Sequence, residues 1–364
     1  MNNNNNNNKI NAFQYAILII FPILSIFNGI GFHNIIKISK RDCYFSILFS
    51  YLIGLIILAM IIYISNYEKD KNIHEKINII FGKPIGNIIN AIINIIIFII
   101  CIVTIYGICN FVTSQFLSET PVLVIGIMIG IVIVYNITKG IEVITRSNII
   151  FLAIILTLSI ISFISLIPQI DKSNLKPILE NGLIPPLKGS IYLTLTNIVP
   201  TLAILTIPKS KVIDYPKINK FLIISYTLSY IIIFLISIKT ISILGLNLTE
   251  IYEYPEYIVL KKISLFNFFD KIENIIFIKW ILTSFSTLSL LIYYLNNSIK
   301  TKKQNIITPI IITTIIVLIS TYYFKNNTLF TNFIETKYPY INLILLTIFA
   351  IITISIVIKK KLTT

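Results

Sequence analysis

The chain has 364 residues, of which 56% are hydrophobic and only 12% are charged, and its mean hydropathy is +0.87. Soluble domains carry about a quarter charged residues, so this composition leaves too little charge for a soluble surface. The composition therefore indicates an integral membrane protein. Two histidines and three cysteines provide no metal-ligand cluster and no His-based catalytic constellation. We expect no enzyme, no bound metal and no cofactor.

The N-terminal segment is of low complexity. Residues 1–9 are an Asn-rich tail that we expect to be disordered, and residues 10–364 are expected to form a single polytopic membrane domain. The first apolar run has one lysine before it and no small-residue cleavage site after it. This pattern predicts a retained span and not a signal peptide.

Ten apolar runs approach the length of about 20 residues that a spanning helix needs. They lie at roughly 12–32, 43–65, 86–110, 121–136, 147–167, 190–207, 221–246, 274–295, 306–324 and 339–358. The fourth and sixth runs are short, so either could instead be re-entrant. The sequence predicts an all-α protein of about ten transmembrane helices.

The positive charges predict the orientation of these spans. If the N-terminus is cytoplasmic, 17 of the 30 Lys and Arg residues fall in inside segments and 11 in outside segments. The positive-inside rule then places both termini in the cytoplasm. The net charge of +15 is scattered over membrane-edge loops, which indicates contact with anionic lipid headgroups and not with nucleic acid.

Two of the predicted spans are interrupted. Span 1 contains Pro22 and then Asn28-Gly29-Ile30-Gly31, and span 6 contains Thr194, Thr196, Asn197 and Pro200. Both are the first helices of five-helix halves, with repeat one at about 10–167, repeat two at about 190–324, and 339–358 completing the layout. Matching breaks point to a midplane binding site in an inverted-repeat transporter. The alternative is that Gly and Pro serve close helix packing.

Broken helices expose groups that suit a zwitterion such as an amino acid. We expect amides around Gly29 and Gly31 to meet a carboxylate, and carbonyls near Thr196 and Asn197 to meet an ammonium group. A hydroxyl stripe in span 8 supplies Thr283 and Thr287, which with Tyr106 form the predicted side-chain pocket. The alternative, and the commoner role of such a stripe, is to hold helices together.

Two lysines lie within predicted spans. Lys279 is about five residues into span 8, next to the only tryptophan, and we expect its stem to snorkel to the interface. Lys239 is deeper and could face a cavity.

Several motifs occur in an order and spacing that resemble a known family. The longest lies between spans 7 and 8 and includes Tyr254-Pro255-Glu256-Tyr257, Lys261-Lys262-Ile263-Ser264, Phe268-Phe269-Asp270-Lys271-Ile272-Glu273 and Trp280. The others are Thr120-Pro121, Gly140-Ile141-Glu142 with Arg146, Asn174-Leu175-Lys176-Pro177, Asn181-Gly182 and Lys188-Gly189-Ser190. Together they resemble the spore germination receptor permease subunit, the B subunit of GerA-type nutrient receptors. Unlike that family, the chain has no acidic residue in 190–207.

The resemblance implies the amino acid–polyamine–organocation superfamily fold, with two inverted five-helix repeats in a LeuT-like arrangement. It also implies a protein of the inner spore membrane that senses a small nutrient, such as an amino acid, with a larger membrane subunit and a lipoprotein subunit. Both termini would then face the spore core. An active amino-acid transporter and a nutrient-gated ion or water pore remain alternatives.

Overall fold

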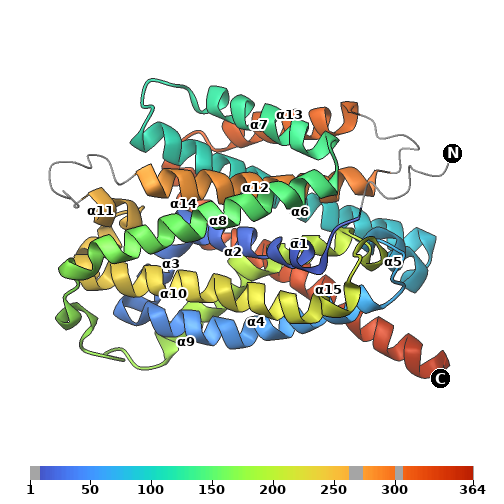
Figure 1. Cartoon of the computed structure of the whole chain (residues 1–364), viewed down its shortest axis with the longest axis horizontal. Coiled ribbons are helices and arrows are strands. Elements are labelled where there is room, and N and C mark those ends of the chain that lie inside the picture. The colour runs from blue at the N-terminus through green and yellow to red at the C-terminus, as the bar shows by residue number, and fades with distance from the viewer. Residues whose placement is uncertain (1–8, 262–273, 300–305, 364) are drawn as a thin grey trace.

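Long helices that lie side by side make up the protein (Figure 1). The computed structural model describes residues 9–261, 274–299 and 306–363. Spans 1 to 5 are α1 (Ala12–Ile17) with α2 (Ile20–Ile26) and α3 (Phe32–Ser39), α4 (Cys43–Asn66), α6 (Lys83–Gln115), α7 (Val122–Thr138) and α8 (Ile141–Leu166). Spans 6 to 10 are α9 (Ile184–Leu193) with its following turns to Thr206, α10 (Ile218–Ile251), α12 (Asn274–Ser298), α13 (Ile307–Tyr323) and α15 (Tyr338–Thr363).

All ten predicted apolar runs form helical segments, and they differ in length. Eight helical stretches of the described chain are long and apolar enough to cross a membrane. The ninth run, α13, passes this test together with α14 (Asn327–Thr336), from which it is bent by 104°. The fourth, α7, is an apolar helix of 17 residues. The prediction of an all-α membrane protein with about ten spanning helices is confirmed.

Two short helices mark opposite ends of the bundle (Figure 1). The helix α5 (Ile73–Phe81) begins at a capping box in which Asn72 and Glu75 exchange side-chain and backbone hydrogen bonds. The helix α11 (Pro255–Lys261) lies at the other end, between α10 and α12. The start of the chain is at the α5 end, where Ile10 pairs with 211–213 through two backbone hydrogen bonds. The last helix also reaches this end, because Lys359 donates to the Ile79 carbonyl.

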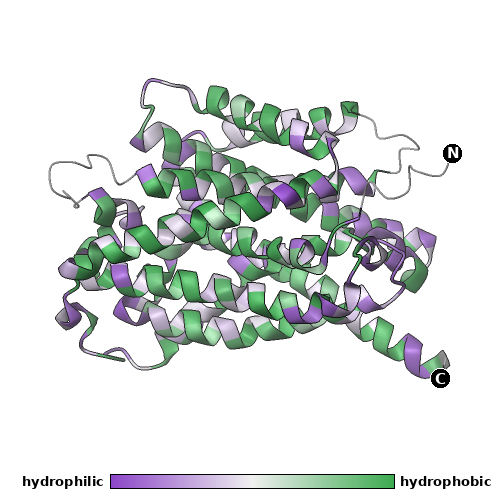
Figure 2. Ribbon diagram, viewed as in Figure 1, coloured by the Kyte–Doolittle hydropathy of each residue, from purple (hydrophilic) through white to green (hydrophobic). Residues whose placement is uncertain are grey.

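The sides of the bundle are apolar, as a lipid environment requires. Figure 2 shows hydrophobic residues along the helices and hydrophilic residues gathered towards the connections and around α5. Large aliphatic side chains stand exposed on these sides, among them Ile56, Ile88, Ile131 and Ile150. An exposed apolar belt of this kind would be a liability in water and suits an acyl-chain surface.

The helix α12 lies inside the bundle and joins its two halves. It packs against α2, α6, α7 and α8. Polar side chains link it to two of them: Asn136 of α7 donates to Ser289 (3.1 Å), and Ser286 donates to Asn148 of α8 (2.7 Å). Ser286 and Ser289, which lie next to the predicted Thr283 and Thr287 along α12, therefore hold helices together.

Candidate functional site

The break in span 1 falls at the predicted glycines. Between α2 and α3 the chain makes a π-type turn over Phe27–Gly31, and Gly29 leaves the helical region with φ −76° and ψ −131°. A Cβ atom on Gly29 would lie 2.7 Å from Cζ2 of Trp280. Glycine is therefore required here because the indole ring of α12 packs directly on the backbone.

The break in span 6 follows α9 directly. A π-type turn over Thr194–Ile198 passes into a 3-10 turn over Val199–Thr206 that has Pro200 at its start. Two hydroxyls donate back to the last turn of α9, Thr194 to the Ser190 carbonyl (2.8 Å) and Thr196 to the Tyr192 carbonyl (2.9 Å). These bonds give acceptor carbonyls partners where the regular helix ladder is interrupted.

The two breaks touch each other. The side chain of Asn197, in the middle of the span 6 break, donates through Nδ2 to the Ile23 carbonyl of α2 at 3.0 Å. Asn34 of α3 donates to the Tyr192 hydroxyl of α9 at 2.7 Å. All of these side chains are buried. Side-chain and backbone polar groups thus join spans 1 and 6 on both sides of the breaks.

A small cavity of about 30 Å³ adjoins the span 1 break. Its lining includes Gly29, Gly31, Trp280 and two residues of α6, Thr104 and Gly107, with Phe330 of α14 on another side. This volume is about that of one water molecule. The Oδ1 atom of Asn28, also at the break, is buried without a hydrogen-bond partner. The site is thus closed around Trp280 in this structure.

The predicted ligand residues are distributed unevenly around this cavity. Gly29 and Gly31 line it, Asn28 and Ile30 belong to the same turn, and Asn197 lies close, because a Cβ atom on Gly31 would be 3.6 Å from its Oδ1. Thr196 donates to the Tyr192 carbonyl and to Asn197.

The predicted side-chain pocket does not form around this cavity. Thr283 and Thr287 are fully buried, donate to carbonyls of their own helix, and do not line the cavity. Tyr106 packs instead against Phe324 and Phe330, with ring centroids 5.0 and 4.7 Å away.

Sequence reasoning missed the residues that fill the site. The sequence shows Trp280 as a motif residue and the only tryptophan, but it does not predict Trp280, Thr104, Gly107 or Phe330 as site residues. A glycine such as Gly107 within a long apolar helix was the available signal, because it marks a close approach of another element.

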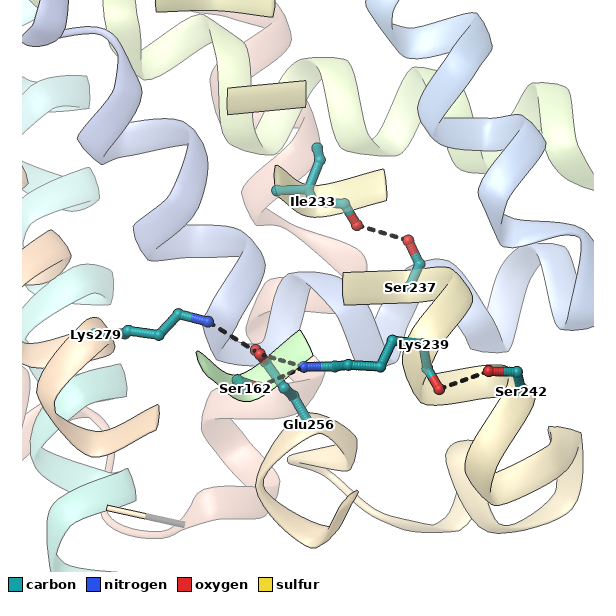
Figure 3. Close-up of polar contacts among 7 residues, drawn as sticks. All are labelled: Ser162, Ile233, Ser237, Lys239, Ser242, Glu256 and Lys279. Atoms are coloured by element: carbon teal, nitrogen blue, oxygen red, sulfur yellow. Dashed lines mark hydrogen bonds and ion pairs between the residues drawn. The ribbon is translucent and has the colours of Figure 1, made fainter. Parts of the chain in front are cut away.

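A buried ionic cluster, shown in Figure 3, lies near the same break, because its Glu256 lines a small pocket together with Gly29. The Oε1 atom of Glu256, in α11, is 3.3 Å from Nζ of Lys239 and 3.1 Å from Nζ of Lys279. Lys239 also donates to the Ser162 hydroxyl of α8 at 2.9 Å. Burial alone would raise the pKa of Glu256, but the two ammonium groups together hold it below its usual value. We call these three residues the Lys-Glu-Lys cluster.

The cluster corrects one prediction. Lys279 does not snorkel to the interface: its side chain is only 1% exposed and points inward to Glu256. The reason is that α11 folds over this end of the bundle and brings a carboxylate to the lysine. Lys239 is buried in the same way.

The remaining motif residues occupy two places. Glu142 and Arg146 pair across one turn at the start of α8, as their spacing predicts, and the Arg146 side chain is 68% exposed. Tyr254 is buried before α11, its hydroxyl accepts a hydrogen bond from Asn110 (3.1 Å), and Pro255 begins the helix. The predicted motif residue Glu273 lies outside the described residues.

Comparison with known proteins identifies the family. The family described as spore germination protein matches residues 9–329. The chain belongs to the spore germination permease family. It is 24% identical to spore germination protein XB of Bacillus anthracis over 298 residues, which cover 81% of this chain and 82% of that protein. It is 28% identical to spore germination protein KB of Bacillus subtilis over 181 residues, 48% of each chain.

The fold also matches a solved transporter. A Na⁺-coupled sialic acid symporter, in a substrate-bound outward-open state, superposes with a TM-score of 0.62 over 96% of this chain and 78% of the symporter. At 11% identity this likeness shows the fold alone, which is LeuT-like. Family and fold together make this member of the spore germination permease family a non-enzymatic integral membrane protein and a permease-like subunit of a germinant receptor.

Proposed function

We propose that this permease binds a small zwitterionic nutrient, such as an amino acid, at the breaks of spans 1 and 6, and that binding triggers germination. The observation that carries the proposal is the 3.0 Å hydrogen bond from Asn197 to the Ile23 carbonyl. This bond joins one break to the other. A ligand that competes for the Asn197 side chain or for the Ile23 carbonyl therefore changes the packing of span 1 against span 6.

The chemistry of the breaks supports a ligand with two charges. A charge that leaves water must meet a partner near the membrane midplane, because an unpaired charge there costs several kcal/mol. The turn at Gly29 and Gly31 offers backbone N–H groups to a carboxylate, and the span 6 break offers carbonyls and the Oδ1 atom of Asn197 to an ammonium group. The unpartnered Oδ1 of Asn28 adds one more acceptor.

The small volume of the cavity at the span 1 break supports a sensor that binds its nutrient in a second, more open conformation. A volume of about 30 Å³ does not hold an amino acid, and Trp280 occupies the space beside Gly29. Nutrient binding requires this ring to move away from the break. A ligand that binds only the open conformation shifts the equilibrium towards that conformation. The partner subunits of the receptor respond to this conformational change.

The test is the dose-response of spores that carry Gly29→Ala. The added methyl would meet Trp280 at 2.7 Å, so the ring is displaced and the nutrient site is altered. With each of the twenty L-amino acids as probe, we expect the effective nutrient's half-maximal concentration to change at least about tenfold, or ~1.4 kcal/mol.

Gly130→Ala is the matched control, because its Cβ would meet Thr313 at 3.1 Å between α7 and α13, away from the breaks. Protein level is checked by immunoblot in both strains. Unchanged half-maximal concentrations in the Gly29 strain at normal protein level would place the nutrient elsewhere.

A transporter is the second candidate, because the matching symporter carries its substrate across the membrane on the same fold. The transporter and the sensor are distinguished by uptake into vesicles that contain the purified protein. The probe is the radiolabelled amino acid that triggers germination. Accumulation above protein-free vesicles favours transport, and binding without accumulation favours sensing.

We further propose that the protein lies in the inner spore membrane with both termini on the core side, together with a larger membrane subunit and a lipoprotein subunit. Exposed Ser173 and Ser210 lie in connections that precede and follow span 6. In a cysteine-free chain, a cysteine at Ser173 is expected to label from outside and one at Ser210 only from the core side. The reverse result would invert the orientation.

A further inference from the structure

A second cavity lies on the lipid-facing side, between α8 and α10. Its volume is about 230 Å³, and its walls include Phe163 of α8 and Leu228, Ile232 and Ile236 of α10. The cavity opens towards lipid, because Ile160 and Ile231 on its rim are 58% and 50% exposed. Lys239 and Lys279 also line it. We call this cavity the lateral groove.

Among the described residues, the lysines give the lateral groove an unbalanced charge. The Lys-Glu-Lys cluster carries two ammonium groups against one carboxylate, which leaves one positive charge among side chains that are at most 6% exposed. An isolated buried charge is expensive unless a counter-charge meets it.

The hydrogen bonds of the cluster are also incomplete. Each ammonium has three donors. Within the described residues, Lys239 reaches Ser162 and Glu256, and Lys279 reaches Glu256 alone. Three N–H donors are therefore left for an acceptor from outside the described chain.

The charged and apolar parts of the groove lie at different positions along α10. Lys239 lies six residues before Gly245, where α10 breaks from helical geometry with φ 71°, so its Cα atom is about 9 Å along the helix from that break. Leu228 lies eleven residues further in, about 16 Å from Lys239 along the helix. The cationic end is thus close to the α11 end of the bundle, and the apolar part runs towards its middle.

We propose that the lateral groove binds a single-chain fatty acid, with its carboxylate accepting hydrogen bonds from Lys239 and Lys279 and its chain lying between α8 and α10. One carboxylate balances the one excess positive charge. The volume lies below the usual range for drug-sized ligands and suits a single chain. The ammonium groups are buried, which favours a small carboxylate over a bulky lipid headgroup.

The experiment uses the purified full chain in phosphatidylcholine nanodiscs, with radiolabelled dodecanoate as probe. We expect saturable binding that unlabelled dodecanoate competes. Dodecanol, which lacks the charge, and dodecyltrimethylammonium, which reverses it, are expected to compete at least about tenfold more weakly, ~1.4 kcal/mol.

Two substitutions at the cluster are expected to change the affinity for dodecanoate in opposite directions. Lys239→Met keeps the side-chain length and leaves the neutral pair Lys279–Glu256, so the protein stays folded while dodecanoate affinity falls at least about tenfold. Glu256→Gln raises the excess charge from one to two and is expected to tighten binding. Lys188→Met, at an exposed lysine of α9, is the matched control and leaves affinity unchanged.

Three results would overturn the proposal. Dodecanol competing as well as dodecanoate would mean that the lysines play no part. Unchanged affinity in Lys239→Met would mean the same, even if Glu256→Gln does not fold. Phosphatidylglycerol displacing dodecanoate at equal concentration would show a headgroup site for phospholipid instead.

Discussion

Two of the ion-pair systems among the described residues make the same chemical contact in opposite surroundings. Glu142 and Arg146 pair on the first turn of α8, and the arginine side chain is 68% exposed. In the Lys-Glu-Lys cluster, no side chain is more than 6% exposed. Water screens the first pair and can replace either partner, whereas nothing among the described residues replaces Glu256. Burial, and not the contact distance, decides how much each ion pair contributes to the stability of the fold.

The largest expected effect is therefore at Glu256. Glu256→Gln leaves two ammonium groups facing each other without a carboxylate, and we expect a loss of about 3–5 kcal/mol of stability. The measurement is the thermal unfolding midpoint of the purified protein in detergent without added fatty acid.

Lys239→Met is the comparison for this variant, because it retains one neutral ion pair. We expect it to lose clearly less stability than Glu256→Gln. Equal losses in the two variants would show that packing, and not charge, sets the stability of this end of the bundle.

Low pH should destabilise the protein as Glu256→Gln does, because both changes remove the negative charge of Glu256. The lysines lower the pKa of Glu256, so its contribution to stability is complete above the unfolded pKa of about 4.3 and is lost as pH falls through the lower folded value. Wild-type unfolding midpoints should fall in that acidic window more steeply than those of Glu256→Gln. Parallel curves for the two proteins would rule out this group as the source of the acid sensitivity.

The smallest stability effect is expected at the exposed pair. Arg146→Ala should cost only about 0.3–0.5 kcal/mol, as for other exposed i,i+4 pairs. We nevertheless predict slower germination, because the motif resembles the family's and its arginine stands exposed at the α5 end of the bundle, where we expect partner subunits to dock. Lys217→Ala removes an exposed charge at the same end and serves as the control. Normal germination of the Arg146 strain at normal protein level would contradict a docking role.

The contrast also marks what the sequence could predict. Apolar runs and the Gly and Pro residues within them predicted the spans and both breaks, because these signals are local in the chain. The pairing of Glu142 with Arg146 is local too, since both residues lie on one helix turn.

The Lys-Glu-Lys cluster was not predictable in this way. Its members come from α10, α11 and α12, and only the folding of α11 over the bundle end joins them. For the same reason, the prediction that Lys279 snorkels to the interface is wrong. The contact of Trp280 with Gly29 is equally non-local, because 250 residues separate the two positions.

That contact has a spectroscopic consequence. Trp280 is the only tryptophan of the chain, and its ring packs on the break of span 1 with a neighbouring cavity about the size of one water molecule. The tryptophan fluorescence of the protein, excited where tyrosine does not absorb, therefore comes from one indole at the proposed nutrient site. Movement of this ring from a buried apolar contact into a wetter space would shift its emission to longer wavelength. The emission wavelength of Trp280 in the unmodified protein thus reports whether the break of span 1 is open.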